Sequence, residues 1–559
     1  MGMDTAMKDG GSLLMECLIT LGAKVGFGVP GESYLAVLNA MHDHQDDFRF
    51  IMARQEGGAA YMAEAWGKLT GDPGLCFVTR GPGATNASIG VHTAMQNSTP
   101  MLLFVGQVGS DMIGREAFQE IDYTAYFGSI AKWVVEIDDA ERIPELISRA
   151  WATALSGRPG PVIVSLPETL LTQEVTTLPC KAVNIPEPAI SMTQLAAVEA
   201  MLNEAEKPVV IVGGSRWEKG GVDALCDFCL GNNLPIVAAH RFHDIIDNHH
   251  DCYAGDASVG MNGYMKSLLR EADVIMAINI RFGEMTTDAY QLFDSPNMKA
   301  KLIHSHVSDG ELGKIYAADL PLHSGPNCFA EALSSIRLTP NAKRQEWCAD
   351  ARHTYLNSFE VAPQESPVDM GVVMGVLAEM LPDDVIVTHG AGNFALWPNR
   401  FMKFGRKSRL LGPQSGAMGA GVPAAIAAKA RYPERTVLCF AGDGDFQMNG
   451  NELGTAMQEN IQPIILILNN GTYGTIRMHQ ERTYPHRVSG TDLINPDFVT
   501  LASAYGFHGE RVANTDEFSA AFGRAMQSST GAVLELMIGT EAISPRATIS
   551  ALRESAKSS

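Results

Sequence analysis

The chain has no long apolar run and no excess of basic side chains, and each absence excludes a class of protein. No stretch of its 559 residues approaches the ~18 consecutive apolar residues of a membrane-spanning helix, so we expect no membrane association. Lys and Arg number 42 against 63 Asp and Glu, which gives a formal net charge of -21. Because nucleic acids and anionic lipids are bound through clustered cations, neither is expected as a partner.

Nine cysteines are scattered along the chain, without the spacing of a disulfide framework or a zinc site. Only Cys226 and Cys229 form a CxxC, and in "GGVDALCDFCLGNN" they lie at i and i+3 of an amphipathic helix, which favours core packing over zinc or redox chemistry. The opening residues, "MGMDTAMKDGG", hold no apolar stretch of a secretory signal. These features predict a protein of the reducing cytoplasm.

Apolar strand-like runs alternate with helical patterns, as parallel sheets covered by helices require. At 60.1 kDa the chain is long enough for about three domains of ~150 to 200 residues each. We therefore predict the α/β class, with three doubly wound parallel-sheet domains. Their predicted ranges are 1–180, 190–340 and 367–545, with a polar, helix-prone connector at 341–366.

One stretch, "GDGDFQMNGNELGTAMQENIQPIILILNN" from Gly442 to Asn470, places an aspartate and an asparagine after two buried strands. Because the carboxyl ends of parallel strands meet at one edge of a sheet, Asp443 and Asn470 are expected to lie together. Carboxylate and amide oxygens suit Mg²⁺ or Ca²⁺ better than zinc, and such a cation bridges to phosphate oxygens. The helix between the strands is expected to start at Asn449, with Glu452 closing a capping box.

Several motifs together resemble a known family. The glycine turn followed by two asparagines is similar to the thiamine diphosphate (ThDP) signature. "RQEGGAAYMAEAWGKLTGDPG", "FVTRGPGATNASIG" and "EAFQEIDYTAYFG" resemble the first domain of the acetolactate synthase branch of ThDP enzymes, and "QSGAMGAGVPAAIAAK" resembles the third. The resemblance covers nearly the whole chain, and it implies that Asp443, Asn470 and the carbonyl of Thr472 bind Mg²⁺.

The resemblance also implies a cofactor site shared between two domains. Glu56 would hydrogen-bond the pyrimidine nitrogen of ThDP, although by position alone it is an ordinary helix-start carboxylate. Met418 would wedge the two cofactor rings into a bent conformer, although by itself it would be a core methionine. The other cofactor contacts that the resemblance implies are Pro30, Pro82, Asn86, Asn393, Gly416, Gly442, Gly444, Asp445, Tyr473 and Gly474.

The implied reaction is decarboxylation of a 2-oxo acid, followed by ligation to an acceptor carbonyl. Gln107, Phe118 and Gln119 would face the substrate from the first domain, where their alternative roles are core packing and solvated surface. In this family the two ends of the cofactor are held by different subunits. We therefore expect a homodimer or homotetramer with active sites at the subunit interface.

The sequence also departs from the synthases. Their RFDDR element is "IRFGEMTTDAY" here, which keeps Arg281 as a candidate anchor for the acceptor acid but loses the second arginine. Their GMHG element beside FAD is replaced by "GDASVGMNGYMKS", so FAD is not expected. After the asparagines, His479 stands where the synthases place a tryptophan in the substrate channel, and Tyr473 stands where they have glutamine.

Three alternatives remain open. A ThDP-dependent 2-oxo acid decarboxylase, or a lyase of the 2-hydroxyacyl-CoA or oxalyl-CoA type, would share every cofactor motif. A cofactor-binding regulatory protein would not need Glu56. A dinucleotide-binding oxidoreductase is favoured only by "IVGGSRWEKGG", a weak glycine pattern without GxGxxG.

Overall fold

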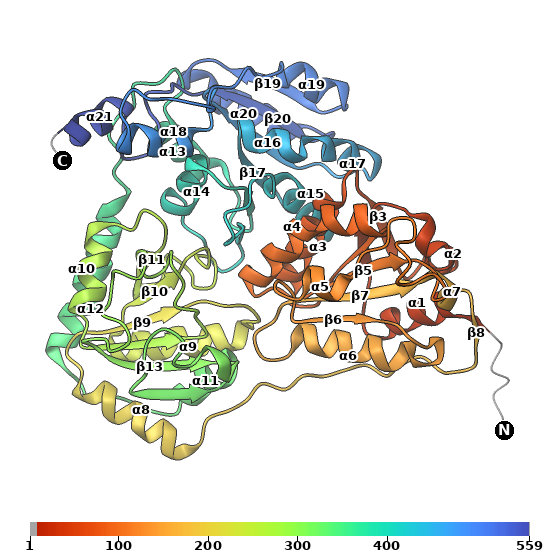
Figure 1. The fold of residues 1–559 in the computed structure, drawn as a ribbon. Helices are drawn as coiled ribbons and strands as arrows, with labels where there is room; N and C mark the ends of the chain where they lie inside the picture. Colours follow the sequence, from red (N-terminus) through yellow and green to blue (C-terminus); the bar gives the residue numbers. More distant parts are fainter. Residues whose placement is uncertain (1–7, 558–559) are drawn as a thin grey trace.

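The computed structural model describes residues 8–557 and shows three α/β domains, each built on a six-stranded parallel sheet (Figure 1). The predicted fold class is confirmed. The strands are continuous apolar runs because helices cover both faces of each sheet; in β5 (Met101–Gln107) all seven residues are buried. Within the described residues, no helix is long and apolar enough to cross a bilayer.

The N-terminal domain has the strand order β3-β2-β4-β5-β7-β6. The bounds of its other sheet strands are β2 (Val25–Gly28), β3 (Arg49–Met52), β4 (Gly74–Val78), β6 (Trp133–Glu136) and β7 (Pro161–Pro167). Its main helices are α1 (Gly10–Thr20), α2 (Leu35–Asp43), α3 (Glu56–Thr70), α4 (Gly81–Asn97) and α6 (Ile143–Leu155). A short antiparallel pair, β1 (Lys8–Asp9) with β8 (Glu174–Val175), closes the domain.

The central domain has the strand order β11-β10-β9-β12-β13-β14. The strands are β9 (Pro208–Val212), β10 (Ile236–Ala239), β11 (Tyr253–Ala257), β12 (Val274–Ile278), β13 (Lys301–His306) and β14 (Leu320–His323). Its helices are α8 (Met192–Glu204), α9 (Lys219–Asn232), α10 (Gly263–Glu271) and α11 (Pro326–Leu333). Cys226 and Cys229 are buried in its core, which confirms the packing role predicted for them.

The helix after the central domain, α12 (Ala342–Leu356), packs back onto that domain. Its Arg344 is only 1% exposed and donates hydrogen bonds to the carbonyls of Leu202, Asn232 and Thr339. Arg344 therefore anchors α12 to the central domain through backbone oxygens.

The C-terminal domain has the strand order β16-β15-β17-β18-β20-β19. The strands are β15 (Ile386–His389), β16 (Arg409–Leu411), β17 (Val437–Gly442), β18 (Ile464–Asn469), β19 (His508–Val512) and β20 (Ala532–Met537). Its helices include α13 (Met370–Met380), α15 (Gly421–Arg431), α16 (Asp443–Asn449), α17 (Leu453–Gln458), α18 (Gly474–Thr483), α20 (Phe518–Gln527) and α21 (Ile549–Lys557).

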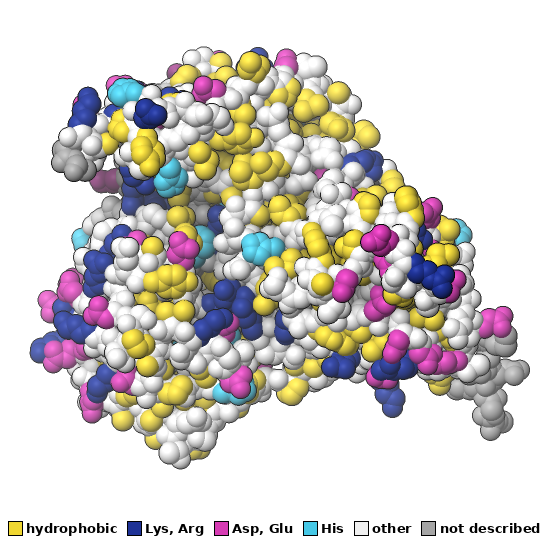
Figure 2. Space-filling view, viewed as in Figure 1, with side chains coloured by type: hydrophobic (Ala, Val, Ile, Leu, Met, Phe, Trp, Pro, Cys, Tyr) yellow, Lys and Arg dark blue, Asp and Glu magenta, His cyan; other side chains and the backbone are white. Residues whose placement is uncertain are grey.

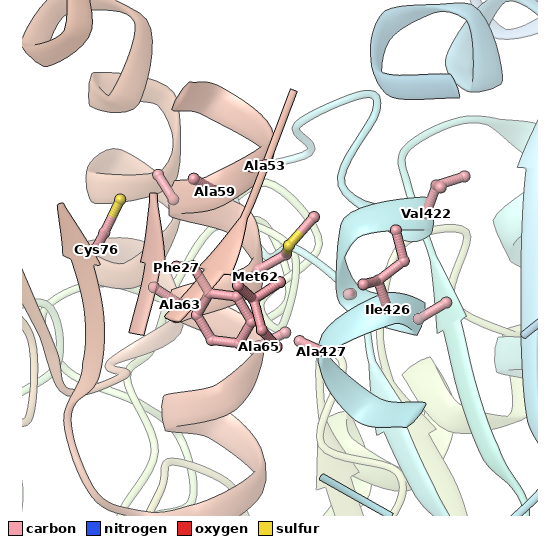
Figure 3. Packing of buried hydrophobic residues seen from close by; sticks show 14 of the residues in the cluster. Phe27, Ala53, Ala59, Met62, Ala63, Ala65, Cys76, Val422, Ile426 and Ala427 are labelled. Atoms are coloured by element: carbon pink, nitrogen blue, oxygen red, sulfur yellow. The ribbon is translucent and has the colours of Figure 1, made fainter. Parts of the chain in front are cut away.

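The N- and C-terminal domains share one hydrophobic core where α3 packs against α15. Figure 3 shows Met62 and Ala65 on the α3 side facing Ile426 and Ala427 on α15. The many alanines allow the two helices to approach closely, so that the start of α3 is held against the C-terminal domain.

Candidate cofactor site

The predicted Mg²⁺ ligands Asp443 and Asn470 lie where two neighbouring strands end. β17 ends at Gly442, and β18 is followed directly by Asn470. The two strands pair in parallel, with Gly442 opposite Leu468. Asp443 and Asn470 therefore lie at the same edge of the sheet, as parallel pairing predicts.

The predicted helix start is confirmed in part: Asn449 is the N-cap residue of a 3-10 turn, Gly450–Glu452, which α17 continues. A further helix, α16, was not predicted; it begins at Asp443, immediately after the strand, and ends at Asn449. The Nδ2 of Asn449 donates to the carbonyl of Gly419, and Glu452 bonds the N-terminal domain instead of the Asn449 backbone. Both side chains found partners across the fold, so the local capping box did not form.

A cavity of about 340 Å³ opens at this edge of the sheet. Every cofactor residue that was predicted in the C-terminal domain lines it: Asn393, Gly416, Met418, Gly442, Asp443, Gly444, Asp445, Asn470, Thr472, Tyr473 and Gly474. Leu468, Ile538 and Ile543 add an apolar wall. A pocket with an apolar body and a few convergent polar groups is typical of a cofactor site.

The carboxylate of Asp443 is held by donors on both oxygens. Oδ1 accepts from the Gly444 N–H at 3.0 Å, and Oδ2 accepts from the Gly471 N–H at 2.9 Å and from Nδ2 of Asn495 at 2.7 Å. Asp443 is 2% exposed, and this burial raises its pKa while the three donors lower it. Sequence reasoning missed Asn495, because it lies in a loop that carries no recognisable motif.

The residues fit a hard cation and a diphosphate. One carboxylate with amide and carbonyl oxygens is the donor set that Mg²⁺ takes, and within residues 8–557 no cluster of three or more His, Cys, Asp or Glu forms a metal site. An ideal Cβ on Gly444 would lie 2.4 Å from the ring of Tyr473, whereas one on Gly416 would meet nothing within 4 Å. Glycine at position 444 therefore allows the Tyr473 ring to pack against the turn. Glycine at position 416 leaves the backbone uncovered beside the cavity and permits its φ of +67°.

Asp445 joins the loops that follow β15 and β16. Its Oδ1 accepts from the N–H groups of Ala391 at 3.1 Å and Gly419 at 2.9 Å. Burial is the main cause that raises the pKa of Asp445, to about 7. Beside Gly419, the carbonyl of Met418 accepts from the Tyr61 hydroxyl of α3 at 3.3 Å. The loop that presents Met418 is thus held from both domains.

The predicted residues of the N-terminal domain form a second group. Glu56 is the first residue of α3, is half-buried, and accepts from Nδ2 of Asn86 at 2.9 Å. Asn86 and Pro82 are exposed on the first turns of α4, and Pro30 is exposed after β2. None of these residues lines the cavity of the C-terminal domain in the same chain.

The three candidate substrate residues of this domain differ in exposure. Gln107 is buried and donates to Glu136 and to the carbonyl of Ile121. Phe118 is 72% exposed, and Gln119 has a left-handed φ of +67°. In the single chain, the large ring of Phe118 is therefore left uncovered, on a loop that the backbone of Gln119 strains.

Arg281 and His479, the two other candidate substrate residues, lie outside the cofactor cavity. Arg281 lines a separate, small cavity of about 20 Å³ at the carboxyl edge of the central sheet, where its Nη1 donates to the Gln96 carbonyl at 2.8 Å. His479 is exposed on α18 and does not line the cofactor cavity. Its neighbour Arg477 is engaged by Glu481 and Asp492.

Three family models match the chain in succession: the thiamine pyrophosphate enzyme N-terminal binding domain over residues 8–126, the central domain over 195–333 and the C-terminal binding domain over 390–536. Thiamine pyrophosphate is ThDP. The fold and the cavity thus define a three-domain ThDP enzyme.

Curated relatives narrow this class. The chain is 32% identical to the acetolactate synthase large subunit of Lactococcus lactis over 520 residues, which cover 90% of this chain and 88% of the relative. It is 31% identical to the mitochondrial acetolactate synthase catalytic subunit of Saccharomyces cerevisiae over 565 residues, covering 96% and 82%. For the Escherichia coli isozyme 2 large subunit the identity is 29% over 534 residues, 95% of each chain. The chain belongs to the acetolactate synthase-like family of thiamine pyrophosphate enzymes.

Proposed function

We propose that this enzyme uses ThDP and Mg²⁺ to decarboxylate a 2-oxo acid and to join the remaining acyl unit to an acceptor carbonyl. The observation that carries the proposal is the cavity in which Asp443, Asn470 and Thr472 meet beside Met418. When bound, ThDP supplies a nucleophilic carbon that adds to the 2-oxo acid and takes up the electrons left by CO₂. Asp443, Asn470 and the Thr472 carbonyl would hold Mg²⁺ against the diphosphate.

Glu56 would act on the pyrimidine end of the cofactor. Its carboxyl group stands at a helix start and is oriented by Asn86. There it would hold a proton on the pyrimidine nitrogen, which makes the cofactor its own base. Glu56→Gln should keep the fold and most ThDP affinity, while C2–H/D exchange of bound ThDP, measured by acid-quench NMR, slows by ~10²- to 10⁴-fold.

The separation of the two residue groups supports a homodimer or homotetramer with shared sites. The cavity contains no residue of the N-terminal domain from the same chain. Large apolar side chains are exposed near each group. They are Ile89 and Phe118 in the N-terminal domain, and Met448 and Ile476 in the C-terminal domain. Figure 2 shows apolar side chains gathered over the C-terminal domain and over the adjoining part of the N-terminal domain. A second copy would cover such surface and supply Glu56.

The reaction is tested by mixing the protein with ThDP, Mg²⁺ and a panel of 2-oxo acids, with and without aldehyde or 2-oxo acid acceptors. CO₂ release with a 2-hydroxy ketone or 2-hydroxy-2-oxo acid product supports ligation. CO₂ release with only the free aldehyde would favour the decarboxylase, and turnover of a CoA ester alone would favour the lyase. His479→Trp and Arg281→Ala should change the ranking of these substrates by kcat/KM if both residues contact them.

We further propose that FAD is not required. Where the synthases carry GMHG, Ser258 bonds Nδ1 of His240 at 2.7 Å, and the Gly260 carbonyl accepts from Arg400 at 2.8 Å and Arg546 at 3.4 Å. This segment is thus engaged by protein groups. The purified protein should be colourless and active without added flavin, and a stoichiometric band near ~450 nm would contradict the proposal.

All nine cysteines are free, which agrees with action in a reducing cytoplasm.

A further inference from the structure

Glu452 is a buried carboxylate of the C-terminal domain that bonds the start of α3 in the N-terminal domain. Its side chain is inaccessible to solvent. Oε1 accepts from the N–H groups of Gln55 at 3.0 Å and Arg54 at 3.2 Å. Oε2 accepts from the Arg54 N–H at 3.1 Å and from the Thr455 hydroxyl at 2.6 Å. The two backbone groups immediately before Glu56 therefore find their acceptor in another domain.

The first turn of α3 is shaped around this carboxylate. The side chain of Gln55 caps the helix by accepting from the N–H groups of Gly57 at 2.6 Å and Gly58 at 3.1 Å. An ideal Cβ on Gly58 would lie 2.4 Å from Oε1 of Glu452. Any larger residue at Gly58 would push the carboxylate away. Desolvation raises the pKa of Glu452, whereas the backbone donors and the helix start favour its charged form.

The contact belongs to a larger docking surface between α17 and the turn before α3. The Arg54 guanidinium donates to the Gly454 carbonyl at 3.0 Å and to the Gln458 side chain at 2.8 Å. Farther from α3, Arg49 pairs with Glu459 at 2.8 Å. Among these contacts, those of Glu452 alone reach the backbone next to Glu56, so the effect of Glu452 can be separated from domain docking in general.

We propose that Glu452 is a positioning residue that fixes the place of Glu56 by bonding the backbone N–H groups of Arg54 and Gln55. This inference rests on the proposed function, because it gives Glu56 the catalytic role. Without Glu452, the N–H groups of Arg54 and Gln55 lose their acceptor and the turn relaxes to regain one. Since a misplacement of ~1 Å at a reacting group can cost ~10²-fold in rate, a small shift of Glu56 is enough to matter.

The test compares four variants. Glu452→Ala removes the acceptor, Gly58→Ala displaces it, and Glu452→Gln keeps one oxygen for the Gln55 N–H. Glu459→Ala is the matched control, because it removes another contact of the same docking surface. Amide hydrogen exchange of residues 50–60 is measured on the chain without cofactor, and C2–H/D exchange of bound ThDP and its affinity are measured on the loaded protein.

We expect Glu452→Ala and Gly58→Ala to speed amide exchange at residues 50–60. C2–H/D exchange of bound ThDP should slow by ~10- to 100-fold, with ThDP affinity within ~3-fold of wild type. Glu452→Gln should restore most of the rate, and Glu459→Ala should match wild type in both exchange measurements. A loss of stability alone would affect Glu459→Ala as well and would not be restored by glutamine.

C2–H/D exchange at the wild-type rate in both Glu452→Ala and Gly58→Ala, with Glu56→Gln slowed, would overturn the inference and leave the proposed function standing. An unaltered rate in Glu56→Gln would instead remove the proposed function. Should Glu452→Ala fail to fold, Gly58→Ala decides: a wild-type rate in that variant contradicts the positioning role.

Discussion

At the scale of single residues, the metal ligand set depends on one charge. Asp443 is the only carboxylate among the three proposed ligands, and its oxygens already have donors from Gly444, Gly471 and Asn495. Asp443→Ala should abolish Mg²⁺-dependent ThDP binding in titration calorimetry, because the remaining amide and carbonyl oxygens hold no charge to offset the cation. ThDP affinity equal to wild type would remove the metal assignment.

His389 makes stability depend on pH. It is fully buried, with Nδ1 2.7 Å from the Gly390 carbonyl and Nε2 3.1 Å from Oδ1 of Asn399, whose Nδ2 has no partner in that orientation. Turning the Asn399 amide lets Nδ2 donate to Nε2, which satisfies a neutral imidazole. Burial and, next, Arg241 lower its pKa well below the usual value.

The sign follows from the protons bound in each state. Below pH ~6.5 the unfolded His389 takes up a proton and the folded one does not, so the free energy of unfolding falls as pH falls, by up to ~1.4 kcal/mol per pH unit. His389→Gln should reduce this slope between pH 7.5 and 5.5 in denaturant titrations. A slope unchanged by the substitution would mean that His389 is protonated in the fold.

At the scale of elements, α21 holds α18 through one buried carboxylate. Glu481 on α18 is fully buried and accepts from Arg553 of α21 at 2.6 and 2.8 Å and from Arg477 at 3.0 Å. Chiefly the Arg553 bonds lower the pKa of Glu481, to about 2. This stabilisation is therefore present above the unfolded pKa of ~4.3 and is lost as pH falls toward about 2.

Arg553→Met should loosen α18, since loss of hydrogen bonds to a charged group costs about 1.5 to 3 kcal/mol. Amide hydrogen exchange should become faster across residues 474–483 and stay unchanged in α3. Arg482→Met, which replaces an exposed arginine of the same helix, serves as the control. Equal exchange in both variants would show that the two helices are held by other contacts.

At the scale of the whole molecule, shared active sites predict complementation between inactive subunits. Glu56→Gln and Asp443→Ala each disable one residue group. In a hybrid dimer one site carries both substitutions and the other carries neither. If mixed subunits exchange at random, about half of the dimers are hybrids with one of two sites intact, so about a quarter of wild-type activity should return. Mixed variants that stay inactive after refolding together would place each complete site in a single chain.

Patterns local to the sequence were enough to predict much of the molecule. Apolar runs such as "TVLCFAG" and "PIILILN" predicted parallel strands, and the strand ends placed Asp443 and Asn470 at one edge of the sheet. The predicted cofactor residues of the C-terminal domain all line one cavity. The strands and their shared edge were predicted correctly because strand burial and parallel pairing depend on periodicity and on chain direction, which a single sequence records.

Only the tertiary structure decided which distant groups meet. It added α16 between Asp443 and Asn449, and it gave Glu452 its partners at Arg54 and Gln55. It also brought Asn495 to Asp443, and it left the N-terminal group outside the cavity of its own chain. Such contacts depend on how whole domains and distant loops pack against one another. That packing is driven by the burial of apolar surfaces, so the polar residues that end up between them carry no periodic pattern in the sequence.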